Sequence, residues 1–171
     1  MNKKNTQKGY SLIEMIIYVS IFAVLSVVVV NSFSVVISSF VESRTNRDLL
    51  ESGNTVLEKI SREIRLASSV DTAGSTLGSS PGVLQLNSVD SSNNARVVKF
   101  VFENNTLNIY ENNTLTGSLI GNNETITSAI FRKITTSAGT AIKVELTLKD
   151  TRGKRQRTEN FYDTIILRGD Y

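Results

Sequence analysis

The chain has 171 residues, enough for one modest domain together with an anchoring segment. It contains no cysteine and no histidine, which excludes a disulfide, a catalytic thiol, a histidine general base and the usual zinc ligands. The composition therefore favours a structural or binding protein over an enzyme. We expect neither a bound metal nor a cofactor, since no catalytic, calcium-binding or phosphate-binding motif is found.

The net charge of +3 comes from the first nine residues. The whole chain has 19 basic and 16 acidic side chains, and Lys3, Lys4 and Lys8 lie in residues 1–9, which hold no acid. Removing this segment leaves 16 basic against 16 acidic side chains. We therefore expect no general electrostatic attraction between the remaining chain and nucleic acid.

Residues 10–30, YSLIEMIIYVSIFAVLSVVVV, are almost entirely apolar and contain one charged residue, Glu14. About 20 apolar residues are enough for a helix to cross a bilayer. The three lysines directly precede this run, and positive residues remain on the cytoplasmic side. The pattern predicts a single-pass protein of the cytoplasmic (inner) membrane, with its C-terminal part on the outer side.

Two other interpretations of the apolar run are an ordinary secretory signal peptide and a simple signal anchor. A signal peptide has an apolar core of about 7–15 residues and a cleavage site with small residues. The present run is longer, and no clear site of that kind follows it. Neither interpretation explains Glu14, because a carboxylate in a membrane helix is unfavourable and usually has a partner. Solvation of Glu14 at the level of the lipid headgroups is the remaining alternative.

Residues 8–14, KGYSLIE, resemble the processing motif of type IV prepilins and pseudopilins. In that family a glycine ends a short basic leader, an aromatic or apolar residue follows, and a glutamate comes four residues later. Gly9, Tyr10 and Glu14 fill these positions. The resemblance implies cleavage between Gly9 and Tyr10 by a prepilin peptidase, N-methylation of Tyr10, and pairing of Glu14 with the amino group of a neighbouring subunit. It also implies other pilin subunits and an inner-membrane assembly platform as partners, and lipid around the helix before assembly.

Helical periodicity continues beyond the membrane segment. An apolar stripe at steps of three and four residues comprises Leu49, Gly53, Val56, Leu57, Ile60, Ile64 and Ala67. The opposite face carries pairs of opposite charge four residues apart, namely Arg44 and Asp48, Arg47 and Glu51, Glu58 and Arg62, and Lys59 and Glu63. We expect this charged face to be solvated. A helix over residues 10–67 would be roughly 85–90 Å long, and its amphipathic half needs a partner for the stripe.

The period changes to two after a loop rich in serine, glycine and threonine at residues 68–82. Apolar residues alternate with other residues at Val98, Phe100 and Phe102, and again at Ile142, Val144, Leu146 and Leu148. Asn104 and Asn105 predict a tight turn before a strand at 106–110, and a last strand is expected near 160–168. Short connections predict an antiparallel sheet.

These elements predict an α+β fold, in which one long N-terminal helix packs its amphipathic half on a C-terminal antiparallel β-sheet. This order is also the pilin architecture. The expected divisions are a basic leader at 1–9, a membrane and assembly half of the helix at 10–33, an amphipathic half at 34–69, and a β-rich domain at 70–171.

The ends of the predicted domain resemble those of minor pilins. Residues 57–70, LEKISREIRLASSV, and 161–171, FYDTIILRGDY, are similar to the group that includes the J-type pseudopilins of type II secretion and the W-type minor pilins. The resemblance implies a minor, structural subunit of a type IV pilus or pseudopilus. Its final location would be an extracellular or periplasmic filament.

The densest basic cluster comprises Arg152, Lys154, Arg155 and Arg157. Such a hairpin tip could contact phosphates, which would make the domain a DNA-binding module or an adhesin presented by the filament. Asp150 and Glu159 flank the cluster, and no aromatic residue is interleaved. We favour a solvated turn and keep nucleic acid as the alternative.

Overall fold

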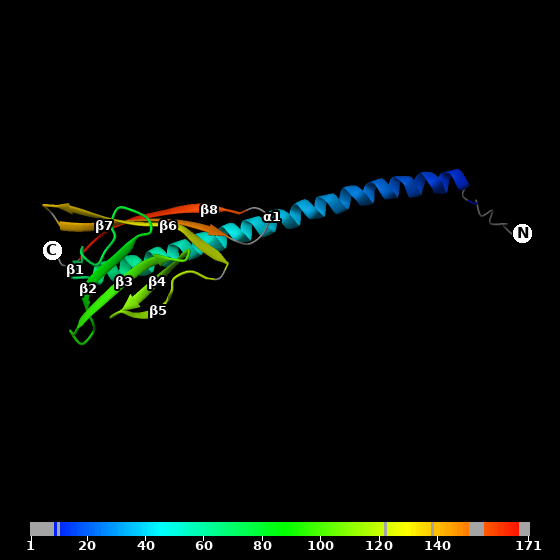
Figure 1. Ribbon diagram of the computed structural model, residues 1–171. Helices are drawn as coiled ribbons and strands as arrows, with labels where there is room; N and C mark the ends of the chain where they lie inside the picture. Colours follow the sequence, from blue (N-terminus) through cyan, green and yellow to red (C-terminus); the bar gives the residue numbers. More distant parts are fainter. Residues whose placement is uncertain (1–8, 10, 122, 138, 151–155, 168–171) are drawn as a thin grey trace, which may run out of the picture. The chain divides into compact units, whose positions relative to one another are not determined.

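The computed structural model describes residues 9, 11–121, 123–137, 139–150 and 156–167. One long helix, α1 (Leu12–Leu66), is followed by strands only (Figure 1). In chain order they are β1 (Ser69–Val70), β2 (Val83–Val89), β3 (Ala95–Glu103), β4 (Thr106–Glu111), β5 (Thr114–Ser118), β6 (Glu124–Thr136), β7 (Gly139–Asp150) and β8 (Thr158–Ile166). The predicted α+β class and the long N-terminal helix are confirmed.

The chain divides into two compact units, and the boundary between Arg44 and Thr45 falls inside α1. In the first unit, serine hydroxyls are satisfied within the helix. The Oγ atoms of Ser20, Ser26 and Ser32 each donate to the backbone carbonyl four residues earlier, at 2.8 Å. These bonds remove the need for water at polar groups in an apolar segment.

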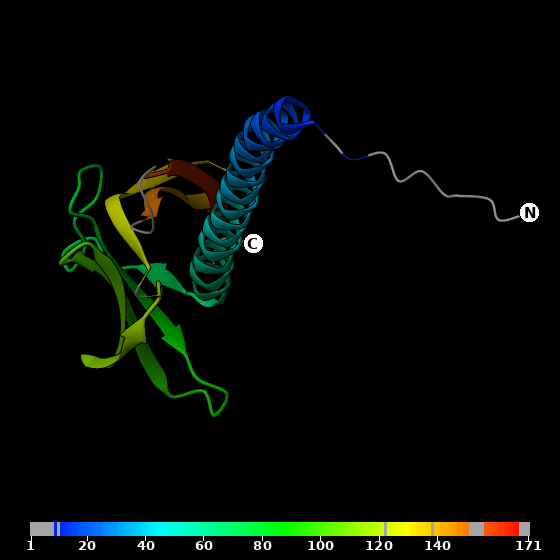
Figure 2. The same ribbon diagram turned by 90° about the vertical axis from the view of Figure 1, so that its right-hand side faces the viewer.

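Two antiparallel sheets make up the strand part of the second unit, where the sequence predicts one. The first has the order β1-β2-β3-β4-β5 and the second the order β6-β7-β8 (Figure 2). The loop before β2 lies along the edge of β6 opposite β7. Gly78 N donates to Phe131 O at 2.8 Å, and Gly82 N donates to Ala129 O at 3.0 Å. Because this loop uses the backbone groups of β6, no strand of the first sheet pairs there.

The core of the second unit lies between the sheets and the C-terminal part of α1. The predicted stripe is buried at Leu49, Val56, Ile60 and Ile64, and burial of each such side chain contributes about 1.5–3 kcal/mol. The strands supply buried residues in alternation, including Leu84, Leu86, Val98, Phe100, Phe131, Ile142, Val144, Leu146 and Leu148. The alternation predicted for β7 is confirmed.

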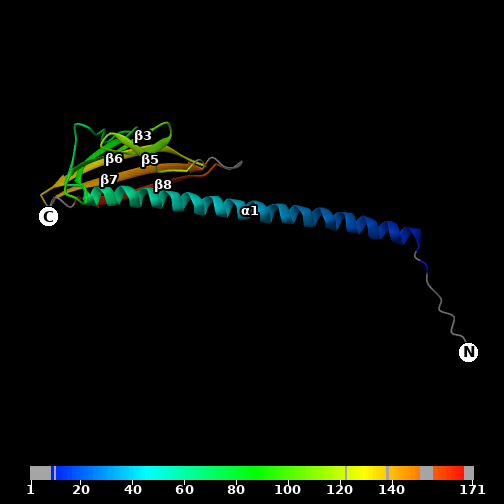
Figure 3. The same ribbon diagram turned by 90° about the horizontal axis from the view of Figure 1, so that it is seen from below.

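Gly53 permits close packing of α1 against β8, which run side by side in Figure 3. A Cβ atom at Gly53 would stand 2.1 Å from the ring of Phe161 in β8. A second contact joins the same elements, since Ser61 Oγ donates to Asp163 Oδ2 at 2.6 Å. The helix and this sheet are therefore held by both apolar and polar contacts.

The predicted asparagine turn is confirmed. Asn104 and Asn105 connect β3 to β4 with φ angles of 51° and 59°. A second pair, Asn112 and Asn113, connects β4 to β5 in the same way, with φ angles of 49° and 65°. Two consecutive residues with positive φ are typical of the two-residue hairpin turn, and asparagine tolerates this conformation.

The prediction of a solvated charged face on α1 is wrong at Glu63, whose side chain is only 3% exposed. The predicted Lys59–Glu63 pair is present, with Nζ and Oε1 3.2 Å apart. A second partner comes from β3, where Arg96 Nη1 lies 2.9 Å from Glu63 Oε2. Arg96 also pairs with Glu111 on β4. Glu63 is buried because β3 covers this side of the helix, and its charge is compensated from there.

Replacement of Arg96, the residue of β3 that pairs with Glu63, should destabilise the second unit. Arg96→Met leaves Glu63 buried with Lys59 as its main partner, so the free energy of unfolding should fall by about 2–3 kcal/mol. The measurement is urea denaturation of the detergent-solubilised chain, followed by the β-sheet circular dichroism signal. As a matched control, Arg132→Met removes an exposed pair with Glu145 and should cost about 1 kcal/mol or less. Equal losses in the two variants would contradict the prediction.

Candidate functional site

Gly9 lies outside regular secondary structure and is exposed. Among the described residues, no atom beyond its own chain neighbours lies within 4 Å of the position where a Cβ atom would stand. Helix α1 begins three residues later, at Leu12, and the backbone carbonyl of Ser11 accepts its first bonds, from the amides of Glu14 and Met15. Tyr10 lies outside the described residues. The described side of the predicted cleavage position is thus open to another molecule.

Glu14 lies in the first turn of α1, where a negative charge is favourable because the free backbone amides point toward it. Its side chain is half-buried, and Tyr18 Oη donates a hydrogen bond to Glu14 Oε1 at 3.0 Å. The two residues are four apart and share one face of the helix. Our sequence reasoning did not identify this partner, although the spacing of four residues was the available signal.

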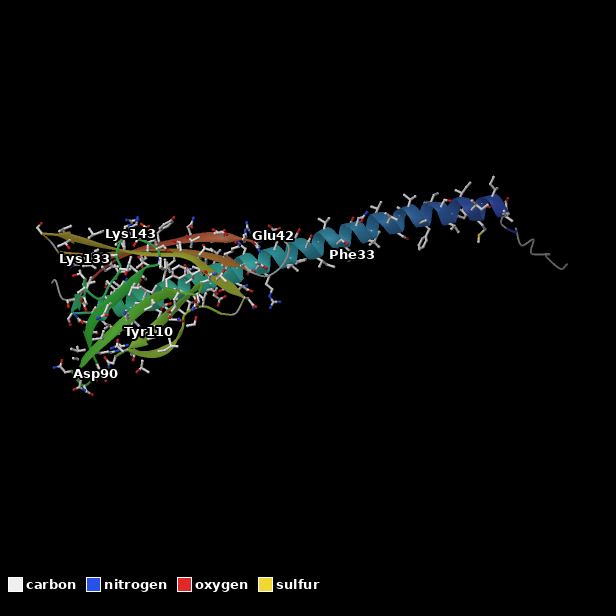
Figure 4. The ribbon with its side chains drawn as sticks, in the orientation of Figure 1. Phe33, Glu42, Asp90, Tyr110, Lys133 and Lys143 are labelled. Atoms are coloured by element: carbon white, nitrogen blue, oxygen red, sulfur yellow. The ribbon has the colours of Figure 1, made fainter. Side chains whose placement is uncertain are left out.

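The apolar surface of α1 that follows Glu14 is uncovered on every side. Every large apolar side chain from Leu12 to Val41 is at least 49% exposed, and Phe33 projects freely from the helix in Figure 4. By length and composition α1 can cross a membrane. An apolar surface of this extent marks contact with lipid or with other proteins.

Most of the predicted basic cluster lies outside the described residues, namely Arg152, Lys154 and Arg155. Arg157 is described and exposed, and its carbonyl accepts a hydrogen bond from Asp150 N at 2.9 Å. Contact of these four residues with nucleic acid therefore stays a prediction.

Two cations on one face of β6 and β7 share a single carboxylate. Lys143, labelled in Figure 4, has its Nζ 2.9 Å from Glu145 Oε1, and Arg132 Nε lies 3.2 Å from the same oxygen. The hydrogen bond from Lys143, followed by that from Arg132, holds the pKa of Glu145 below its ordinary value. Lys143 Nζ also lies 5.8 Å from the centre of the Tyr162 ring. Glu145 therefore offsets only one of these two positive charges, and the face keeps positive charge.

In the described part of the chain, no group of three or more acidic side chains is arranged to hold a metal ion.

The comparison with known families identifies the N-terminal segment. A family profile described as the prokaryotic N-terminal methylation motif matches residues 4–30, which include Gly9, Tyr10 and Glu14. This motif indicates a type IV pilin-like precursor. No curated protein and no solved structure matches it. The motif supports the type IV pilin and pseudopilin family, whose members are structural, and it implies processing by a prepilin peptidase and assembly with other pilins. The apolar part of α1 fits a membrane-anchored precursor that later enters a filament.

The hydrogen bond between Tyr18 and Glu14 should matter for assembly and not for processing. Tyr18→Phe removes the donor to a carboxylate, a bond of the kind worth about 1.5–3 kcal/mol. We expect normal leader removal and a severalfold lower amount of the chain in sheared filaments, measured by quantitative immunoblotting. Tyr162→Phe makes the same chemical change on β8 and serves as the control. Equal amounts of both variants in filaments would show that Tyr18 does not orient Glu14.

Proposed function

We propose that this protein is a minor structural subunit of a type IV pilus or of a related secretion or competence pseudopilus, and that it is not an enzyme. The observation that carries the proposal is the N-terminal methylation motif, in which an exposed Gly9 precedes an uncovered apolar helix with a single carboxylate, Glu14. In this proposal residues 1–9 form a leader, and residues 10–33 form the part of the helix that packs with other subunits. Residues 34–69 connect that part to the β domain, and residues 70–171 form the domain that the filament displays.

Cleavage between Gly9 and Tyr10 is the proposed first step. It removes Lys3, Lys4 and Lys8, and with them the net positive charge of the side chains. It leaves the apolar helix intact and frees the amine of Tyr10 for methylation. The helix can then leave the bilayer only for another apolar environment, and a bundle of neighbouring pilin helices provides one.

Pairing of Glu14 with a neighbour is the proposed second step. Inside an apolar bundle a carboxylate and an ammonium are each unfavourable alone and stabilise one another as a pair. Glu14 lies four residues after Tyr10, so its carboxylate and the new N-terminus lie near the same end of the helix bundle. The Tyr18 hydroxyl satisfies one carboxylate oxygen, and the other remains available for the incoming amine.

The assignment to a minor subunit rests on the similarity of residues 57–70 and 161–171 to minor pilins and pseudopilins. Major pilins of several lineages close their last loop with a disulfide, which this cysteine-free chain cannot form.

Replacement of Gly9 should block leader removal. A bulky side chain in Gly9→Leu changes the residue that supplies the cleaved carbonyl, so the precursor should accumulate in the membrane with its lysines attached. Intact-mass measurement distinguishes the two forms, because the mature chain begins at a methylated Tyr10. Gly121→Leu, at an exposed position with open space for a side chain between β5 and β6, serves as the control for processing. A wild-type chain that retains Met1 in the filament fraction would refute the proposed cleavage.

Neutralisation of Glu14 should separate processing from assembly. Glu14→Gln keeps the shape of the side chain and removes the charge that attracts the neighbouring amine. We expect normal cleavage after Gly9 and at least about a tenfold loss from filaments, since breaking a buried charge pair costs several kcal/mol. Glu58→Gln, on the second unit, is the matched control. Normal incorporation of the Glu14 variant would exclude the proposed pairing.

A further inference from the structure

The sheet of β6, β7 and β8 separates its charged side chains between its two faces. Along β7 buried residues alternate with half-buried ones. The buried apolar ones, which face the core, are Ile142, Val144, Leu146 and Leu148. Lys143, Glu145 and Lys149 alternate with them and share the opposite, outer face. Arg132 of β6 joins them, because it is directly opposite Lys143. In the described residues, the outer face therefore has three basic side chains and one acidic side chain.

The other acids of these three strands lie on the inner side. Glu124 and Asp150 are buried, and Asp163 accepts a hydrogen bond from a serine of α1 at 2.6 Å. Glu159 is directly opposite a buried leucine of β7 and shares its side of the sheet. The side chains beyond residue 9 balance in charge overall, yet strand alternation gives this sheet a positive outer face.

An exposed aromatic ring lies among the positive groups of the outer face. Tyr162 of β8 is directly opposite Glu145, and its residue is 62% exposed. Lys143 Nζ lies 5.8 Å from the centre of the ring. The next opposed pair along the strands adds polar groups, since Thr147 Oγ1 donates to Asn160 Oδ1 at 2.8 Å. The basic cluster predicted from the sequence has no interleaved aromatic residue, whereas the strand register places one on this face.

The spacing of the cations suits a polymer of negative charge better than one small anion. The Cβ atoms of Arg132 and Lys143, a directly opposed pair, are about 5 Å apart. Lys149 lies six residues further along β7 than Lys143, a separation of about 20 Å at 3.4 Å per residue. A small anion can contact only one end of this row. A nucleic acid strand carries a negative charge at every nucleotide, so one strand can contact both ends.

We propose that the outer face of β6, β7 and β8 binds single-stranded nucleic acid. Phosphates contact Arg132, Lys143 and Lys149, and a base stacks on the ring of Tyr162. Stacking on an aromatic side chain is favourable for every base, so the binding has little sequence preference. A duplex keeps its bases stacked on one another and can use only the cations. An acidic polysaccharide has the charge but no aromatic base, so the contribution of Tyr162 distinguishes it from a nucleic acid strand.

Fluorescence anisotropy of the detergent-solubilised full chain with a labelled oligothymidylate of about 15 nucleotides tests the proposal. Lys143→Gln and Lys149→Gln should each weaken binding severalfold. Each should also lower the slope of log affinity against log salt concentration by about 0.7, the value for one phosphate contact with a single strand. Lys133→Gln removes the same charge from an exposed residue of β6 that is directly opposite the buried Ile142, on the other face. This matched control should leave the affinity and the slope unchanged (Lys133 and Lys143 are labelled in Figure 4).

Variants of Tyr162 and Glu145 test the ring and the sign of the charge effect. Tyr162→Leu should weaken binding about tenfold, since it removes the stacking surface. Tyr162→Phe keeps the ring and should bind as the wild type does. Glu145→Gln removes the acid that pairs with Lys143 and Arg132, so it should strengthen binding severalfold. A thermal unfolding measurement of each variant separates an effect on binding from an effect on folding.

Several results would overturn the proposal. One is the absence of binding by the wild-type chain at low salt. Another is an equal loss of affinity in Lys133→Gln and Lys143→Gln, which would indicate general attraction by charge. A loss confined to replacement of the predicted basic cluster would place the contact there instead. Displacement of the oligothymidylate by alginate as efficient as by unlabelled oligothymidylate, with no effect of Tyr162→Leu, would assign the face to acidic polysaccharides. Each of these results leaves leader removal and filament assembly untouched, so the proposed function is tested separately.

Discussion

The uncovered apolar surface at the start of α1 is the constraint on which the rest of the molecule depends. Side chains from Leu12 to Val41 cannot be covered by the chain's own first unit, because that unit contains nothing but the helix in its described part. Lipid or other helices must supply the cover. The serine hydroxyls and the Tyr18–Glu14 bond follow from the same constraint, since each satisfies a polar group within the helix itself.

The later part of α1 differs, because its apolar side chains form a single stripe and the β-sheets cover that stripe. Gly53 allows β8 to approach, and Ser61 adds a polar contact to the same strand. The ion pair of Glu63 with Arg96 ties the helix to the first sheet as well. Both sheets contact this helix, and the loop before β2 also bonds directly to β6, so the two sheets are held together without strand pairing between them.

Local patterns explain which parts of this fold could be predicted. The helix followed from its apolar run and its period of 3.6, β7 from a clean period of two, and the first hairpin from Asn104 and Asn105. The edge of the second sheet is covered by a loop whose Gly78 bonds to Phe131, more than fifty positions away, and such a contact leaves no local signal in the sequence. Burial of Glu63 depends on Arg96 in the same way. At the candidate site, Gly9 and Glu14 were recognisable because the motif and the helix are contiguous in the sequence, whereas the hydrogen-bond donor to Glu14, Tyr18, lies outside the motif residues that carried the resemblance.

Apolar packing alone leaves the displacement of one subunit along the next undetermined, and a carboxylate in the packed surface can restrict it. A bundle of smooth apolar helices has similar energy at many displacements, because burial depends on area and hardly on register. In the proposed assembly, Glu14, in the first turn of α1, penalises every displacement that leaves it without a positive partner.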